Sequence, residues 1–204
     1  METGTVSPAE AAFVTELPRK TIEQAIDRDE VQAALEAGAR TLGLAELVYL
    51  HLRRDLARTL SPAARREVYQ QIRDDLLHAG QVSQVEMGPV VVDILPAAEE
   101  VRERLAQLND ARDFVVSDPA VRGGEPVVRG TRVPVHMLAE LATQGATLAE
   151  MLEDFPGVST EALEAALLYA EVHPRRGRPR RAPWREIGEA KDETTPRPGG
   201  ECDS

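Results

Sequence analysis

The chain of 204 residues contains a single cysteine, Cys202, and only 3% aromatic residues. One thiol near the end of the sequence excludes an internal disulfide framework and a cysteine-based zinc site, and it favours a reducing compartment such as the cytoplasm. No apolar run approaches the length of a membrane span, and the first residues lack the basic-then-apolar pattern of a signal peptide. With so few aromatics the core must be aliphatic, and we expect a homodimer because dimerisation would add buried area.

Lysine is also scarce: of the 24 lysine and arginine residues, only Lys20 and Lys191 are lysines. The net charge of −11 argues against a general nucleic-acid binder. The charge is unevenly distributed. Between Arg132 and Arg175 the chain has no lysine or arginine but seven acidic residues, whereas residues 174–185 carry six arginines and no acid. We therefore expect different parts of the chain to face partners of opposite charge.

Residue patterns typical of enzymes are missing. The four histidines lie far apart in sequence without metal-ligand spacing, and no glycine-rich loop carries the Lys and Ser/Thr of a phosphate-binding loop. The carboxylates are numerous but scattered, as on solvated helix surfaces. We therefore expect no enzymatic activity, no metal and no cofactor. The histidines are His51, His78, His136 and His173.

The first sixty residues predict a helix-turn-helix. The run Ser7-Pro8-Ala9-Glu10 is a strong helix start, because its serine, proline and glutamate suit the cap, the first helical position and a capping box. This helix should run to about Val14, and after a three-residue break a second helix should cover residues 18–27. Residues 31–35 and 39–42 could pair as a small wing. The arrangement resembles the front end of winged-helix and MerR-like regulators.

The second of these helices is the candidate DNA reader, because its first turn is basic and polar side chains follow along one side. An ordinary solvated, charged helix is the alternative, since residues 1–60 carry ten acids against seven bases. The candidate DNA-binding residues are Arg19, Lys20, Thr21, Gln24, Arg28 and Arg40.

The middle of the chain predicts further helices over residues 44–56, 61–77 and 96–109. Residues 84–94 have the composition of a strand, with Gly88-Pro89 as a bulge or bend. Another strand is expected over residues 112–117.

The run from Gly123 to Pro134, GGEPVVRGTRVP, cannot be a helix because glycine and proline interrupt it every few residues. It predicts a tight turn, a short strand over residues 126–128, a second turn, and an extended lead into a helix whose first turn holds the proline. On the residues alone, we favour a structural hairpin without chemistry. The residues of this structural motif are Gly123, Gly124, Pro126, Gly130, Thr131, Arg132 and Pro134.

Three helices should follow, over residues 135–143, 148–154 and 160–172. The second has a capping box from Thr147 and Glu150, and Ser159 caps the third.

The run GGEPVVRGTRVPV, preceded by Ser117-Asp118-Pro119 and followed by Gly145 and by Asp154-Phe155-Pro156, resembles the signature of domain-of-unknown-function family 433. The resemblance covers roughly Phe114 to Tyr169. It implies a VapB-like antitoxin with a homeodomain-like core of three helices and a PIN-like ribonuclease as partner.

The three helices of this unit carry no cation that could contact phosphate, and their carboxylates would face the DNA backbone in a groove. We therefore interpret the unit as a protein–protein module, despite the homeodomain-like outline that the resemblance implies.

The arginine-rich segment that follows contains prolines and glycine that prevent a helix. Three interpretations stay open: a basic arm for nucleic acid, a solvated linker, or a strap that enters the carboxylate cluster of a PIN-like ribonuclease. We favour the strap, because the resemblance supplies a partner of matching charge. Its toxin-binding residues would be Arg175, Arg176, Arg178, Arg180, Arg181 and Trp184.

Together these features predict a mainly α chain with short strands, in which an N-terminal winged-helix-like unit precedes a β-hairpin and a C-terminal homeodomain-like three-helix unit. The expected divisions are a DNA-binding domain over 1–60, connecting helices and strand over 61–111, the family 433 domain over 112–173 and a disordered tail over 174–204.

The expected function is that of a cytoplasmic antitoxin of a type II toxin–antitoxin system. Such a protein would neutralise its ribonuclease and repress its own operon by binding operator DNA. The alternatives are a stand-alone transcriptional regulator and an oligomeric adaptor that binds no DNA.

Overall fold

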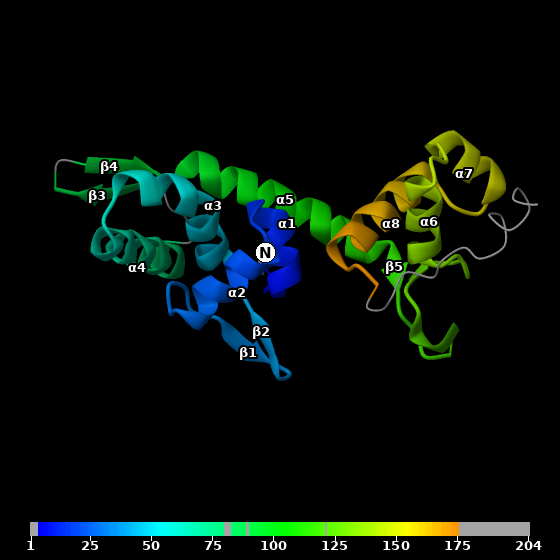
Figure 1. Cartoon of the computed structure of the whole chain (residues 1–204), viewed down its shortest axis with the longest axis horizontal. Helices are drawn as coiled ribbons and strands as arrows, with labels where there is room; N and C mark the ends of the chain where they lie inside the picture. Colours follow the sequence, from blue (N-terminus) through cyan, green and yellow to red (C-terminus); the bar gives the residue numbers. More distant parts are fainter. Residues whose placement is uncertain (1–3, 80–82, 89, 121, 176–204) are drawn as a thin grey trace, which may run out of the picture.

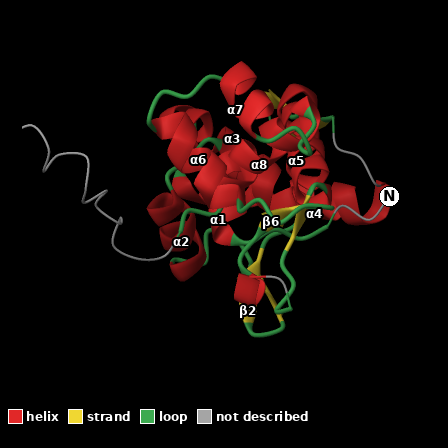
Figure 2. Ribbon diagram, turned by 90° about the vertical axis from the view of Figure 1, so that its right-hand side faces the viewer, coloured by secondary structure: helices red, strands yellow, loops and turns green. Residues whose placement is uncertain are grey.

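The computed structural model of the chain describes residues 4–79, 83–88, 90–120 and 122–175. The molecule is elongated and mainly helical (Figure 1). One lobe holds α1 to α4 with two β-hairpins, the other holds α6 to α8, and the long helix α5 (Leu95–Asp113) runs from the first lobe to the second. Figure 2 shows how little of the described chain is strand.

The two helices expected near the start of the chain are present. In α1 (Pro8–Thr15) the capping box is complete, because the Ser7 hydroxyl accepts the Glu10 N–H while Glu10 accepts the Ser7 N–H. The helix ends at Glu16, whose φ of 55° turns the chain. Pro18 then leads into α2 (Arg19–Asp27), which buries Ile22, Ala25 and Ile26 on one face.

The strands expected over residues 31–35 and 39–42 pair as an antiparallel hairpin of β1 (Ala34–Glu36) and β2 (Ala39–Thr41). Ala37 and Gly38 connect the strands with φ values of 50° and 80°. Positive φ at both central residues is the geometry of a type I′ turn, which matches the twist of a two-residue hairpin. A bridge between Val6 and Leu42 fastens the hairpin to the segment before α1.

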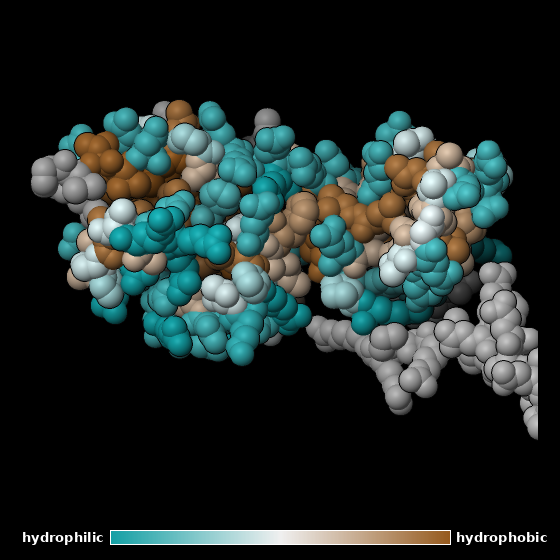
Figure 3. Space-filling view, turned by 45° about the horizontal axis from the view of Figure 1, so that its top comes forward, coloured by the Kyte–Doolittle hydropathy of each residue, from teal (hydrophilic) through white to brown (hydrophobic). Residues whose placement is uncertain are grey.

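Helices α3 (Leu44–Thr59) and α4 (Pro62–Ala79) pack against each other, and α3 also contacts α1. The strand expected over residues 84–94 was wrong in form, because β3 (Gln84–Met87) and β4 (Val90–Asp93) pair antiparallel. Gly88, with a φ of 58°, lies where the chain reverses direction. Figure 3 shows apolar surface around this end of the molecule, where Leu77, Val91 and Leu95 are exposed.

The second lobe begins with a further correction. The strand expected over residues 112–117 is reduced to β5 (Val115–Val116), since α5 continues to Asp113. β5 pairs antiparallel with β6 (Val127–Val128), and the short 3-10 turn η1 (Arg122–Gly124) lies between them. The remaining helices have the expected bounds: α6 (Val135–Thr143), α7 (Leu148–Asp154) and α8 (Thr160–Val172).

The buried apolar residues form two clusters, one for each lobe. The first is shared by α1 to α5, so the helices expected to connect the domains contribute to the same core as α1 and α2. Val172, at the end of α8, also belongs to this first core. None of the described helices has the combination of length and apolar character needed to cross a membrane.

Candidate nucleic-acid interface

The exposed side of α2 presents Lys20, Gln24 and Arg28 at intervals of four residues. Residues at this spacing lie on one face of a helix. The opposite face of α2 is buried through Ile22, Ala25 and Ile26. This packing fixes the direction in which the three polar side chains point. Among the residues that the structure describes, no carboxylate pairs with Lys20 or Arg28.

The other expected DNA-binding residues are placed differently. Arg19 pairs with Glu23 at 2.8 Å, and Arg40 of the wing pairs with Asp27 at 2.6 Å. The second pair joins β2 to the end of α2. Thr21 is only partly exposed. The α2 helix and the β1–β2 hairpin therefore form one surface, on which Arg19 and Arg40 are each paired with a carboxylate.

A basic pocket of about 310 Å³ extends this surface beyond α2. Arg28 lies at one wall, and Arg65 and Arg66 from the first turns of α4 lie at another, with Tyr49 and Glu30 also lining it. The Nε atom of Arg65 is buried and has no hydrogen-bond partner among the described residues. Such a pocket suits an anion such as a phosphate. The sequence analysis missed Arg65 and Arg66, because nothing in their local pattern places α4 beside α2.

The electrostatics of the pocket are consistent with an excess of positive charge. Glu30 binds Arg53 at 2.8 Å, and this bond is the largest influence that lowers the pKa of Glu30, with nearby Arg65 and Arg28 contributing further. Burial raises the pKa of Tyr49, whereas Arg65 opposes that shift. One carboxylate is thus surrounded by several guanidinium groups.

A buried carboxylate links this front surface to the second lobe. Glu10 caps α1 with one oxygen, and its other oxygen lies 2.5 Å from Arg112 of α5 and 3.1 Å from His173 after α8. Burial alone would raise the pKa of Glu10, but the bonds from His173, Arg112 and Ser7 outweigh it and lower the pKa to about 2. This cluster holds α1 against the C-terminal ends of α5 and α8.

In the structure, the glycine- and proline-rich run of residues 123–134 shapes the backbone between β5 and α6. Gly123, Gly124 and Gly130 all have positive φ, between 69° and 86°, which glycine adopts without strain. The Thr131 hydroxyl donates to the Val128 carbonyl at 2.8 Å and accepts the Val133 N–H at 3.1 Å. These bonds close the loop after β6, so the motif fixes the backbone in front of α6.

Three details complete this motif. Pro126 accepts the Val135 N–H at 2.9 Å through its carbonyl. Pro134 was expected in the first turn of α6, which is wrong: it precedes the helix in extended conformation and bridges Val127, and this pairing delays the helix to Val135. Arg132 is exposed on the loop.

Only Pro174 and Arg175 of the arginine-rich segment are described. Arg175 pairs with Glu125 of the motif and lies 3.5 Å from Glu140 of α6. Burial lowers the pKa of His136, and Arg175 lowers it further. The other expected toxin-binding residues, Arg176, Arg178, Arg180, Arg181 and Trp184, lie outside the described residues.

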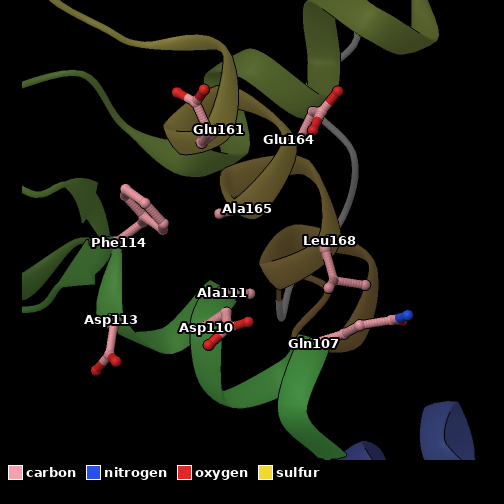
Figure 4. A pocket seen from close by; sticks show the side chains of 9 residues that line it. All are labelled: Gln107, Asp110, Ala111, Asp113, Phe114, Glu161, Glu164, Ala165 and Leu168. Carbon is pink, nitrogen blue, oxygen red and sulfur yellow. The ribbon is translucent and has the colours of Figure 1, made fainter. Parts of the chain in front are cut away.

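The side of the second lobe between α5 and α8 contains a groove of about 630 Å³. Phe114 and Leu168 lie at the apolar floor, the carboxylates of Asp113, Glu161 and Glu164 lie at the rim and point outward, and no basic residue lines the groove (Figure 4). The carboxylates at this groove would repel phosphate. Within the described ranges no group of histidine, cysteine or acidic side chains is arranged to hold a metal ion.

Comparisons with known proteins give one related sequence, one solved structure and one family model. The chain is similar to "Uncharacterized protein y4eO" of Sinorhizobium fredii (strain NBRC 101917 / NGR234), with 43% identity over 91 residues. The alignment covers 45% of this chain and 41% of that protein, so it spans less than half of the relative's length.

A crystal structure of Rv2018 from Mycobacterium tuberculosis also aligns with the chain. The alignment covers 79% of this chain and 96% of that one, at 20% identity and a TM-score of 0.31. A likeness at that TM-score carries no argument about the fold.

Residues 115–170 match the family model described as "Protein of unknown function (DUF433)". The match begins at β5 and ends within α8, so it includes the glycine- and proline-rich motif and the three helices of the second lobe. The chain therefore contains a DUF433 domain at residues 115–170.

Proposed function

We propose that this protein is a DNA-binding antitoxin of a type II toxin–antitoxin pair. In this proposal the first lobe binds the operator, and residues 175–185 neutralise a PIN-like ribonuclease. The observation that carries the DNA-binding part is the exposed row of Lys20, Gln24 and Arg28, which continues into the arginine pocket at the start of α4.

In this proposal the first lobe acts as a winged helix-turn-helix, with α1 and α2 as its helices and the β1–β2 hairpin as its wing. The α2 helix would enter the major groove, where Gln24 can bond a base edge and Lys20 can reach base or phosphate. The β1–β2 hairpin would lie against the neighbouring backbone. Arg28, Arg65 and Arg66 would grip a phosphate beside the groove, because a guanidinium pairs with phosphate oxygens in a bidentate manner.

In this proposal α6, α7 and α8 form a homeodomain-like unit whose charge suits a protein partner instead of DNA. Between Arg132 and Arg175 there is no cation to contact phosphate. The strap would begin at Arg175, next to the motif, and would deliver arginines to the metal-binding carboxylates of the ribonuclease. Trp184 would anchor the complex, since Trp and Arg dominate interface hot spots. We infer a homodimer, which would bind two operator half-sites.

The DNA-binding part is tested by fluorescence anisotropy with a duplex taken from directly upstream of the reading frame, measured over a series of salt concentrations. Each lost phosphate contact should reduce the slope of log K against log salt by about 0.9. We expect weaker binding and a shallower slope for Lys20→Ala with Arg28→Ala, and for Arg65→Ala with Arg66→Ala. Arg132→Ala, on the second lobe, is the matched control and should behave as the wild type. Equal slopes for all the variants would contradict the assignment of this surface.

The toxin part is tested by co-expression with the product of the adjacent reading frame. Truncation after Pro174 should abolish neutralisation while operator binding persists, because the first lobe is intact. Neutralisation by the truncated chain would refute the strap. If operator binding is observed but no adjacent product co-purifies with the full chain, the protein is a stand-alone regulator.

A further inference from the structure

The groove between α5 and α8 has a composition that neither the fold nor the DNA-binding proposal explains. Asp110 and Asp113 project from the end of α5, and Glu161 and Glu164 from the start of α8, around the side chains of Phe114 and Leu168 (Figure 4). The volume of about 630 Å³ falls in the range of about 300–1,000 Å³ that ligand pockets occupy. Four carboxylates around an apolar floor suit a ligand that is both cationic and hydrophobic.

The described part of the chain does not provide such a ligand. No basic residue lines the groove, and Arg112, which lies on α5 between two of the acids, is turned to Glu10 on the other side of the helix. The second lobe contains no lysine or arginine between Arg132 and Arg175.

We propose that the groove is the docking site for the chain's own segment 176–185, with its arginines on the four carboxylates and Trp184 over the apolar floor. The sequence of this segment, RGRPRRAPWR, contains five arginines, no acid and the one tryptophan of the chain. Its charge and its single large apolar side chain complement both components of the groove.

The length of the chain allows the segment to dock on its own molecule. From residue 172 back to residue 161, α8 spans about 17 Å, whereas ten extended residues reach about 33 Å. A short tether also gives a high effective concentration, which favours the own segment over that of another copy.

Docking would hold segment 176–185 in the groove when no toxin is bound. This consequence rests on the proposed function: a toxin would have to compete with the groove for the same arginines. The docking itself does not depend on a toxin, and it is tested without one. Failure of the docking test would leave the operator and toxin experiments unaffected, and the reverse also holds.

Trp184 is a natural reporter, because its fluorescence comes from one position in the full chain. At low salt we expect its emission to be blue-shifted, and its acrylamide quenching constant severalfold smaller, relative to a free peptide of sequence 176–185. Both effects should disappear in high salt, because the Debye length falls from about 10 Å at 0.1 M to about 3 Å at 1 M.

The decisive variant is Asp110→Asn with Glu164→Gln, which should raise the quenching constant to that of the free peptide. Both residues are exposed, and circular dichroism verifies that the fold is retained. The matched control is Glu153→Gln with Asp154→Asn on α7, which removes two exposed charges away from the groove and should change nothing.

The proposal is overturned if Trp184 of the wild type is as accessible as in the free peptide, or if Asp110→Asn with Glu164→Gln leaves its protection unchanged. Loss of protection on serial dilution would also overturn it, because docking within one molecule is independent of protein concentration.

Discussion

Replacement of Glu10 by glutamine tests whether one buried carboxylate holds the two lobes together. The substitution preserves the shape of the side chain and removes its charge. Arg112 and His173 would then face a neutral amide, although the capping interaction with Ser7 could persist through the amide oxygen. The side chain of Glu10 is only 7% exposed, so water cannot readily replace the lost partner.

The magnitude follows from the pKa of Glu10, which is lowered from 4.5 to about 2 in the folded protein. A depression of this size corresponds to about 3 kcal/mol of stability at neutral pH. Because the folded pKa is the lower one, this contribution is fully present above pH 4.5 and is lost as the pH falls through 2. At pH 3 only about 1.5 kcal/mol of it should remain.

The assay is urea denaturation followed by circular dichroism, with wild type and Glu10→Gln compared at pH 7 and pH 3. The variant should be less stable by about 2–3 kcal/mol at pH 7, and the difference should shrink to about half at pH 3. Glu153→Gln, at an exposed position on α7, is the control and should stay within about 0.5 kcal/mol of the wild type at pH 7. A difference under about 1 kcal/mol at pH 7, or an equal difference at both pH values, would refute the reasoning.

Two further predictions concern the cores of the two lobes. In the first, Tyr69→Phe should cost about 1–2 kcal/mol in urea denaturation, because the Tyr69 hydroxyl accepts the Gln32 N–H at 2.9 Å and donates to buried Glu46 at 2.7 Å; an unchanged midpoint would mean that water replaces both bonds. In the second, Leu138→Ala should cost about 2–5 kcal/mol, because Leu138 is fully buried. The paired control Leu148→Ala, at a position that is 39% exposed, should cost much less, and equal losses would contradict the described core.

Much of the local structure could be predicted from the sequence. The capping boxes at Ser7 and Thr147 mark helix starts because both partners lie within one turn, and the structure contains both. The DUF433 motif is also local, since its glycines and Thr131 act within a few residues of one another. The three helices after it accordingly have the expected bounds.

The predictions for residues 84–94 and for Pro134 were wrong because in each case the local sequence is compatible with two structures. A Gly-Pro step between valine-rich runs is compatible with a bent strand or with a reversal, and only the pairing of β3 with β4 distinguishes them. Pro134 suits the first turn of a helix as well as the residue before it, and its bridge to Val127 decides the matter.

The charged residues show the same limit over longer distances. The sequence suggests that Glu10 caps a helix, but its salt-bridge partner Arg112 follows 102 positions later. In the sequence, Arg65 and Arg66 cannot be distinguished from other exposed arginines. Only the tertiary structure places them in a pocket with Arg28.

The sequence by itself therefore determined the helices and the turns, through its hydrophobic periodicity and its helix-capping residues. It also determined the uneven distribution of charge along the chain. Each of these features depends on residues close in sequence. Tertiary structure alone decided which charges neutralise one another and which remain available. That outcome depends on distances of a few ångströms between segments far apart in the chain, as in the arginine pocket, the Glu10 cluster and the groove between α5 and α8.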